Sequence, residues 1–220
     1  MANLVFFEKN HRYTVDGEEV PSVSELTRFI AREIYGEIQQ TVLDTAAARG
    51  TKVHKAAEAL DKFGSVEIDD DLLGYIKAYV SFLHEHKAVW EKIEWPVNNG
   101  LLYAGTLDRY GTVDGIRAIV DLKSTAKIDR GHKTLYTAAQ NLYRLAIEPD
   151  HHVEKLLILQ LAKDGNYKLI ELEVQNELAE ACITLHQALK KKKRTRKDEK
   201  NEEVLSNPPC RAHALRARGR

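Results

Sequence analysis

The residues of this chain best placed to do chemistry are Asp108, Asp121 and Lys123, which the sequence pattern puts on one β-hairpin. Asp114-Gly115 is a strong signal for a two-residue hairpin turn. A turn there places Asp108 directly opposite Asp121, with Lys123 two residues further along the same face. Two like charges opposite each other destabilise a sheet unless one takes a proton or a cation lies between them. We therefore expect a divalent metal ion between the two carboxylates.

The two strands of this hairpin are predicted from runs that alternate apolar and polar residues, 101–110 and 116–124. In the same register Leu107 faces Leu122 and Arg109 faces Val120. Since these pairs are mostly apolar, their face is expected to be the core side of the hairpin. The opposite face, with the carboxylates, is expected to be the functional side.

Helices and further strands must position this hairpin. The N-terminal region reads as short strands that turn near residues 10 and 16, followed by a capping box from Ser22 to Glu25 that opens a helix. A helical region follows over 41–63, where Gly50 is expected to interrupt the helix, and then another helix reaching about residue 90. The remaining elements are predicted as strands over 93–98, 101–110 and 116–124, a helix over 132–147, strands over 153–162 and 167–174, and a final helix from about 176.

Composition places ordinary limits on the protein. The 220 residues are 43% hydrophobic and 30% charged, with a formal net charge of zero, which is typical of a globular protein. Binding to a polyanion must therefore come from local clusters of charge. With Cys182 and Cys210 as the only cysteines, a disulfide framework, a structural zinc site and a four-cysteine cluster are not expected. We expect a cytoplasmic protein without a signal peptide or membrane span, in a bacterial or phage-infected cell.

One domain is predicted over residues 1–195, with its core at about 41–162. From Lys190 the sequence becomes a basic run and then a mixed-charge, arginine-rich end. Residues 196–220 are expected to be a disordered, charged tail. The basic run from Lys190 to Lys197 reads mainly as a solvated helix end, and contacts to phosphates are the alternative.

The order of elements, together with four motifs, resembles a known superfamily. The motifs are Arg49-Gly-Thr-Lys-Val-His54, Gly105-x-x-Asp108, Asp121-x-Lys123 and Gln140-x-x-Tyr143. They fall on a helix, three strands, a helix and a strand, as in the PD-(D/E)XK nucleases. The chain is most similar to the RecB-like branch, which includes phage-type exonucleases and the mitochondrial genome maintenance exonuclease. The resemblance implies an α+β, restriction-endonuclease-like αβββαβ core with a mixed sheet flanked by helices, and extra helices at the N-terminus.

The resemblance also implies roles for individual residues. His54, Asp108, Asp121 and the main-chain carbonyl of Leu122 would be metal ligands, since such donors suit Mg²⁺ or Mn²⁺. Lys123 would hold or deprotonate the attacking water and offset charge on the phosphate. No iron-sulfur cluster is implied.

Nucleic-acid contacts are implied for a second set of residues. Gln140 and Tyr143, three residues apart on one helix, would point at the cleft, Gln140 ordering Lys123 or a phosphate and Tyr143 facing the strand. Ser22 is a further candidate for binding DNA, because helix N-termini bind phosphates well.

Each role has a plainer alternative. Asp108 and Asp121 would be ordinary strand residues if the register were different, and His54 would be a surface helix residue. Gln140 and Tyr143 could belong to a plain helix surface or a core edge, and Ser22 is first of all a helix cap. In the other direction, Glu94 on the first of the three strands could join the metal site.

Together these observations predict a Mg²⁺- or Mn²⁺-dependent deoxyribonuclease, an exonuclease acting on single-stranded DNA or DNA ends in replication, recombination or repair. Candidate partners are a recombinase, a helicase or a single-strand-binding protein, because the chain has no P-loop motif of its own. The alternatives are a nucleic-acid-binding protein that keeps the nuclease fold without cleaving, and a small-ligand protein whose Asp-Gly hairpin only resembles the motif.

Overall fold

The computed structural model describes residues 3–148 and 150–206, with side chains as far as residue 192. Contacts divide the chain into a unit Met1–Ile183 and a second unit from Thr184 onward. The first unit contains every candidate site residue and is described below. Of the second unit, the structure describes the continuation of helix α6, Asn176–Ser206.

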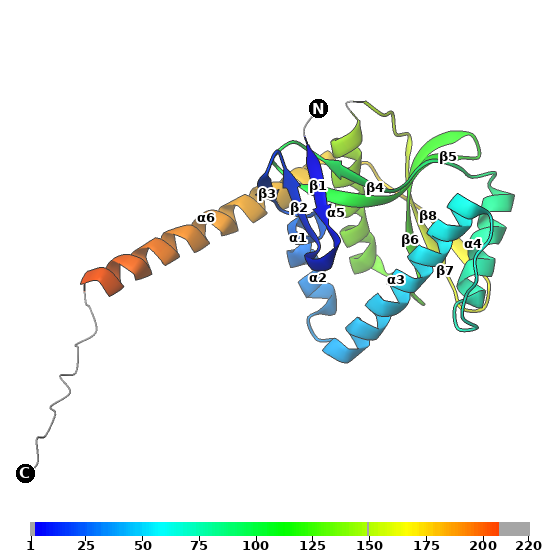
Figure 1. The fold of residues 1–220 in the computed structure, drawn as a ribbon, viewed down its shortest axis with the longest axis horizontal. Helices are drawn as coiled ribbons and strands as arrows, with labels where there is room; N and C mark the ends of the chain where they lie inside the picture. The colour runs from blue at the N-terminus through cyan, green and yellow to red at the C-terminus, as the bar shows by residue number, and fades with distance from the viewer. Residues whose placement is uncertain (1–2, 149, 207–220) are drawn as a thin grey trace, which may run out of the picture. The chain divides into compact units, whose positions relative to one another are not determined.

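A five-stranded mixed sheet forms the centre of the first unit. Its strand order is β4-β5-β6-β7-β8, with β6 and β7 parallel and the other neighbours antiparallel. Helix α5 makes the crossover between the two parallel strands (Figure 1). The bounds are β4 Val89–Asn98, β5 Ala104–Val113, β6 Ile116–Lys123, α5 Arg130–Ile147, β7 Lys155–Leu161 and β8 Tyr167–Leu172.

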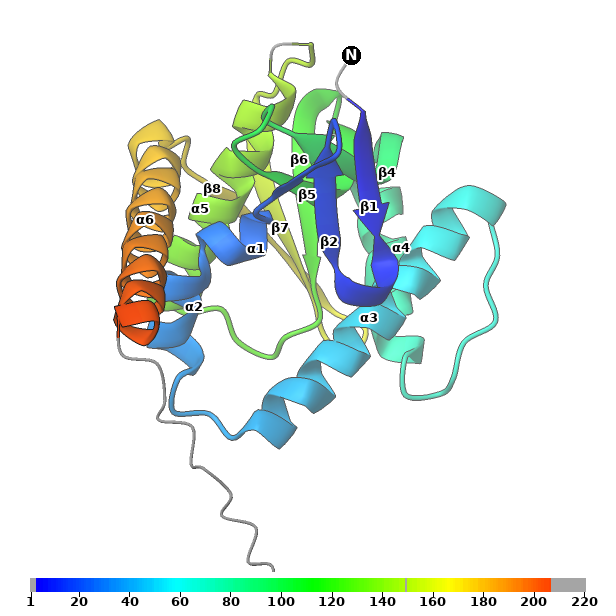
Figure 2. The same cartoon turned by 60° about the vertical axis from the view of Figure 1, so that its left-hand side comes forward.

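Helices cover both faces of this sheet. Figure 2 shows α3 (Gln40–Phe63) and α4 (Leu73–Glu85) on one side, with α2 (Arg28–Tyr35) and α5 on the other. Each side has its own buried apolar cluster, one around Tyr79 and Phe82 of α4 and one around Leu135 of α5. Helix, three antiparallel strands, crossover helix and parallel strand follow in the predicted order. The restriction-endonuclease-like αβββαβ fold is confirmed.

A small antiparallel sheet precedes this core. It consists of β1 (Leu4–Phe7), β2 (Arg12–Val15) and β3 (Glu18–Val20), with a short 3-10 turn, η1 (Glu8–Asn10), between the first two strands. An isolated bridge between Ser22 and Ala104 ties its end to β5. The predicted capping box is present at helix α1 (Val23–Leu26), where the Ser22 side chain accepts from the Glu25 N–H and the Glu25 carboxylate accepts from the Ser22 N–H.

The hairpin of β5 and β6 has the predicted register. Val113 pairs with Ile116, and the ladder runs to Arg109 opposite Val120. Asp114 and Gly115 both have positive φ, as a type I′ turn requires, because this turn matches the twist of the strands. Beyond Arg109 the two strands part, and β6 continues along β7 instead. Asp108 and Asp121 therefore lie where the hairpin opens.

Several sequence predictions were wrong in detail. The helix expected to reach residue 90 ends at Glu85, and Lys87 with positive φ turns the chain so that β4 begins at Val89. Helix α3 passes through Gly50 without a break. Both faces of the hairpin are buried, because α5 covers the face of Tyr110 and Ile119.

The predicted C-terminal boundary of the domain lies within a long helix. The expected boundary at residue 195 falls inside α6, which runs on to Ser206. Its lysine- and glutamate-rich sequence has high helix propensity, which accounts for that continuation. Residues 207–220 lie outside the described residues. In the part of the chain that the structure describes, no helix combines the length and apolar character needed to cross a membrane.

Candidate metal centre and active site

Asp108 makes its key contact at the point where β5 and β6 separate. Its Oδ2 accepts a hydrogen bond of 2.8 Å from the main-chain N–H of Leu122. The Asp108 side chain therefore continues the hydrogen bonding between β5 and β6 beyond the last backbone pair. This contact fixes the carboxylate beside the backbone of β6, and only 12% of the side chain is exposed.

His54 reaches the same point from α3. Its Nε2 lies 2.9 Å from the carbonyl oxygen of Leu122, and its Nδ1 lies 3.6 Å from Asp108 Oδ2. Three of the predicted metal ligands, His54, Asp108 and the Leu122 carbonyl, are therefore brought together from three different elements, α3, β5 and β6. The alternative of a surface helix position for His54 is wrong, because its side chain is 25% exposed and contacts the strands.

Glu94 of β4 joins this group. Its Oε1 lies 3.6 Å from His54 Nδ1, and one ligand atom from each of His54, Glu94 and Asp108 falls within 4.8 Å of the others. Ligand atoms of an octahedral Mg²⁺ lie about 2.1 Å from the ion, so they are about 3 to 4.2 Å apart. Small side-chain shifts would give that spacing. One imidazole and two carboxylates also form a donor set that suits Mn²⁺ or Mg²⁺.

Asp121 lies beside this group with a different partner. Its Oδ2 is 2.6 Å from Nζ of Lys123, so the two residues form an ion pair, whereas the sequence predicted a cation between Asp121 and Asp108. Lys123 Nζ also lies 5.2 Å from the centre of the Tyr136 ring, an arrangement that favours a cation. We refer to His54, Glu94, Asp108, Asp121 and Lys123 as the carboxylate cluster.

The protonation states of the carboxylate cluster follow from its burial and its charges. Burial would lower the pKa of His54, but the charge of Asp108 and contact with Glu94 raise it to about 9. Burial likewise opposes the charge of Lys123, and the carboxylates of Asp121 and Asp108 outweigh it, so the pKa of Lys123 is raised. Burial, with repulsion from Asp108, raises the pKa of Asp121. Without a bound cation, His54 and Lys123 therefore both carry a proton at neutral pH.

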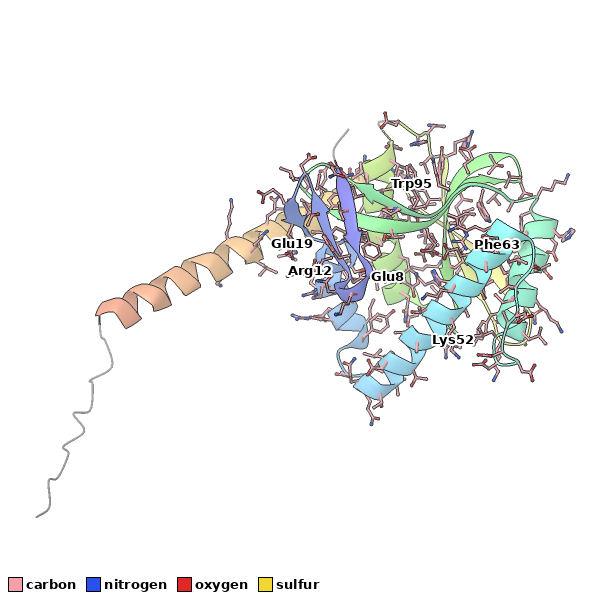
Figure 3. The ribbon with its side chains drawn as sticks, viewed as in Figure 1. Glu8, Arg12, Glu19, Lys52, Phe63 and Trp95 are labelled. Atoms are coloured by element: carbon pink, nitrogen blue, oxygen red, sulfur yellow. The ribbon has the colours of Figure 1, made fainter. Side chains whose placement is uncertain are left out.

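A second set of charges lies immediately behind the carboxylate cluster. Arg109, with a fully buried side chain, donates through Nε to Asp61 Oδ2 at 2.7 Å and through Nη1 to Glu94 Oε1 at 3.0 Å. The Tyr79 hydroxyl donates to Asp61, and Trp90 Nε1 donates to that hydroxyl at 2.9 Å. We refer to Asp61, Tyr79, Trp90 and Arg109 as the arginine network. Figure 3 shows the packed side chains between α3, labelled at Lys52 and Phe63, and β4, labelled at Trp95.

Gln140 of α5 is buried, and Tyr143 of the same helix is partly buried. A Cβ atom on Gly105 would come within 2.8 Å of the Tyr143 ring, so the glycine of Gly105-x-x-Asp108 is what lets this ring approach β5. Burial and the charges of Asp108 and Asp121 raise the pKa of Tyr143 well above its ordinary value. Gln140 is 1% exposed, and its amide has no hydrogen-bond partner among the described residues. The plain-surface alternative is therefore wrong for Gln140.

Ser22 is placed as a helix cap. Its side chain is used in the capping box, and the residue is 6% exposed. Little of it is open to a phosphate, and α1 is a single turn. The geometry favours the capping role over the DNA contact for this residue.

Sequence reasoning gave Glu94 a minor place and gave Arg109 no role beyond a core position. The available signal was the predicted register, which set a permanently charged arginine on the core face and so required a buried acidic partner. A contact between the Tyr13 and Thr106 hydroxyls, 2.9 Å apart, was also missed. It joins the N-terminal sheet to β5 two residues before Asp108, and it depends on a long-range packing that no local pattern indicates.

Comparisons with known proteins give likenesses of fold. No protein-family model matches the chain, and no curated protein sequence matches it. Among solved structures, a phage-related exonuclease from Haemophilus somnus 129PT is 13% identical, with a TM-score of 0.42 over 76% of this chain and 92% of that one. The protein SSO0001 is 12% identical, with a TM-score of 0.36 over 76% of each chain. These likenesses concern the fold, and the function proposed below follows from the geometry of the carboxylate cluster.

Proposed function

We propose that the protein is a divalent-metal-dependent nuclease that hydrolyses phosphodiester bonds in DNA. One observation carries the proposal: donor atoms of His54, Glu94 and Asp108 converge beside the Asp121–Lys123 ion pair, at the point where the hairpin opens. A cluster of three partly buried carboxylates is costly for a protein to keep. Such a cluster is what binding a divalent cation requires.

His54, Glu94 and Asp108 would hold the ion, with the Leu122 carbonyl and Asp121 as the further ligands that the motif implies. When bound, the ion would lower the pKa of a water and polarise the scissile phosphate. His54 must give up its Nδ1 proton to serve as a ligand, because only the neutral ring nitrogen has a free electron pair. Asp108 is already oriented for this work by the Leu122 N–H.

Lys123 would act on the attacking water or on the phosphate. Asp121 holds its Nζ at 2.6 Å, so the ammonium has one fixed position next to the ligand carboxylates. The negative charges of Asp121 and Asp108 keep the lysine protonated, and neutralising them would lower its pKa toward the range of a general base. In its charged form it would offset negative charge on the phosphate.

Gln140 and Tyr143 would act from α5. The amide of Gln140, which has no hydrogen-bond partner among the described residues, has both a donor and an acceptor to offer to Lys123 or to a water beside it. Tyr143 is held against Gly105 with its hydroxyl in the field of Asp108 and Asp121, which keeps it protonated and able to donate. We propose Tyr143 as a contact to the DNA strand, whereas the buried Gln140 would act by ordering Lys123 or a water beside it.

The finer features of the proposal come from the motifs. They are exonuclease action on single strands or ends, the use of Mg²⁺ or Mn²⁺, a role in replication, recombination or repair, and cooperation with a recombinase, helicase or single-strand-binding protein.

The test is cleavage of end-labelled single- and double-stranded DNA with Mn²⁺, Mg²⁺ or a chelator. We expect metal-dependent release of nucleotides from the ends, abolished by chelator and reduced about 10²- to 10⁴-fold in Lys123→Ala, the usual effect of losing an acid–base group. Cleavage that continues at the wild-type rate in Lys123→Ala would rule out the proposed mechanism.

The chain offers a matched control for that variant. Lys155 and Glu171 form a cross-strand ion pair of 2.9 Å on β7 and β8, outside the carboxylate cluster. Lys155→Ala should cleave at the wild-type rate. DNA binding without any turnover in the wild-type protein would favour the non-catalytic alternative instead.

A further inference from the structure

Glu94 occupies a strained position in β4. Its φ is +45°, a value that residues other than glycine rarely adopt, and the β4–β5 register shifts between Trp90 and Lys92. Such a backbone conformation is unfavourable and persists only where the surroundings enforce it. The strand therefore departs from regular geometry close to the residue that contributes the third donor to the carboxylate cluster.

Arg109 is the residue that holds the Glu94 side chain. It donates from Nη1 to Glu94 Oε1 at 3.0 Å, and from the same nitrogen to the Asp108 carbonyl at 2.7 Å. The oxygen that it holds is the one 3.6 Å from His54 Nδ1. Arg109 thus touches the backbone of one proposed metal ligand and the side chain of another.

The second side of Arg109 is neutralised. Its Nε donates to Asp61, whose side chain is 3% exposed, and Asp61 is itself held by the Tyr79 hydroxyl. Because Asp61 compensates the guanidinium charge, Arg109 can hold Glu94 without strongly repelling a cation in the carboxylate cluster.

We propose that Arg109 is a positioning residue that fixes Glu94 in the carboxylate cluster and so sets the affinity for the divalent ion. The inference depends on the metal site of the proposed function. A glutamate with a 25% exposed side chain would otherwise sample solvent-facing rotamers, and ordering it at each binding event would cost free energy. Residues that orient metal ligands typically contribute about 10- to 100-fold in metal affinity.

The test measures Mn²⁺ affinity directly, by calorimetry or by the paramagnetic resonance of free Mn²⁺, without DNA. Arg109→Met combined with Asp61→Asn removes both buried charges and leaves no unpaired ion in the core. We expect this double variant to keep the wild-type circular dichroism spectrum and to bind Mn²⁺ about 10- to 100-fold more weakly. Lys155→Ala, which lies outside both sets of charges, should bind Mn²⁺ with wild-type affinity.

A background without the Glu94 carboxylate separates positioning from a general structural role. In Glu94→Gln, adding Arg109→Met with Asp61→Asn should weaken Mn²⁺ binding no further, because the effect of Arg109 passes through Glu94. A further tenfold loss in that background would overturn the inference. So would wild-type affinity in the folded double variant.

If the double variant does not fold, Arg109→Lys serves instead. Its single ammonium cannot span Asp61 and Glu94, and we expect weaker Mn²⁺ binding in a folded protein.

Failure of this inference can be told apart from failure of the proposed function. A wild-type protein that binds Mn²⁺ but cleaves no DNA contradicts the proposed nuclease and leaves the Arg109 comparison intact. A wild-type protein that cleaves DNA while the folded double variant retains full Mn²⁺ affinity contradicts only the role of Arg109. A wild-type protein with no Mn²⁺ affinity overturns both.

Discussion

Two cationic side chains, one buried and one partly exposed, lie on neighbouring strands of the same hairpin, and they are held in opposite ways. Arg109 is fully buried and donates to the Asp61, Tyr79 and Glu94 side chains and to a carbonyl. Lys123 is 28% exposed and has one carboxylate, Asp121, with the Tyr136 ring beneath it. The arginine has a rigid fork of donors and a permanent charge, whereas the lysine can move and change its pKa.

The difference shows that one hairpin contains both a structural set of charges and a set that could act in catalysis. In the arginine network, the charges of Arg109 and Asp61 neutralise each other at a buried part of β5. The carboxylate cluster is crowded with like charges where the strands part, and burial raises the pKa of Asp121. We infer that the arginine network stabilises the fold and orients Glu94. The carboxylate cluster destabilises the folded protein and is retained for its function.

Asp121→Asn should give the largest effect and should separate activity from stability. Because Asp121 has a raised pKa, its charge is unfavourable in the folded protein, and neutralising it should raise the unfolding temperature in chelator. Activity should fall by about 10²-fold or more, since Lys123 loses its orienting partner. Nuclease assays and thermal unfolding on the same preparations measure both.

Asp114→Asn is the control for that substitution, because Asp114 lies at the turn of the same hairpin and pairs with His86. It should leave the rate of cleavage unchanged. If Asp121→Asn lowered stability and kept its activity, the assignment of the two sets of charges would be reversed.

The same change made at the two cations sharpens the contrast. Arg109→Met leaves Asp61 buried and unpaired, and breaking a buried ion pair in this way costs about 3 to 5 kcal/mol. Lys123→Met should cost clearly less, because water reaches both partners of its ion pair. Urea unfolding in chelator gives the two free energies. Equal losses would mean that the arginine network is no more structural than the carboxylate cluster.

The pH dependence of stability should reveal the proton held by the carboxylate cluster. The pKa of His54 is about 9 in the folded protein and about 6.5 in the unfolded chain, so its stabilising contribution is complete below pH 6.5. It is lost as the pH rises through about 9, with an amplitude on the order of 3 kcal/mol.

Urea unfolding in chelator at several pH values between 6 and 10 measures this contribution. His54→Asn should remove the slope. A wild-type protein whose stability stays level from pH 6.5 to 9 would contradict the charge state described here. His86 pairs with the exposed Asp114 instead, so His86→Asn should keep the slope and serves as the control.

The hairpin could be predicted from the sequence because its determinants are local. The Asp114-Gly115 turn and the alternation on each side fix the register, which places Asp108 next to the end of the β5–β6 ladder. The position of His54 came from the resemblance to a known superfamily, and its contact with the Leu122 carbonyl agrees with it. The order of helices and strands followed from periodicity in the same way.

The sequence offered Glu94 only as an alternative member of the metal site, because its place there depends on positions far apart in the sequence. Its carboxylate joins the cluster through the irregular backbone of β4 and the donor of Arg109 on the neighbouring strand. The sequence also placed Asp121 opposite Asp108, but the β5–β6 ladder ends at Arg109 and Val120, and Asp121 pairs with Lys123 on its own strand instead. Local patterns give the elements, whereas the exact donor set depends on how their ends separate.

Two glycines offer the smallest effect and test how tightly the carboxylate cluster is enclosed. A Cβ on Gly105 would lie 2.8 Å from the Tyr143 ring, whereas a Cβ on Gly50 would meet only Ser124 Oγ, at 3.9 Å. Gly105→Ala should therefore cost about 1 to 3 kcal/mol through overpacking. Gly50→Ala, in the middle of α3, should stabilise the protein by about 0.5 to 1 kcal/mol.

The same pair of variants should differ in activity as well as in stability. The Tyr143 ring, held against β5 beside Asp108, must shift when Gly105 gains a methyl group, and contacts to the DNA strand should shift with it. Replacing Tyr143 by leucine in the Gly105→Ala protein should recover stability, because the smaller side chain leaves room for the methyl group, but it should not recover cleavage. Recovery of both would mean that Tyr143 serves packing alone, and that the carboxylate cluster meets its substrate without help from α5.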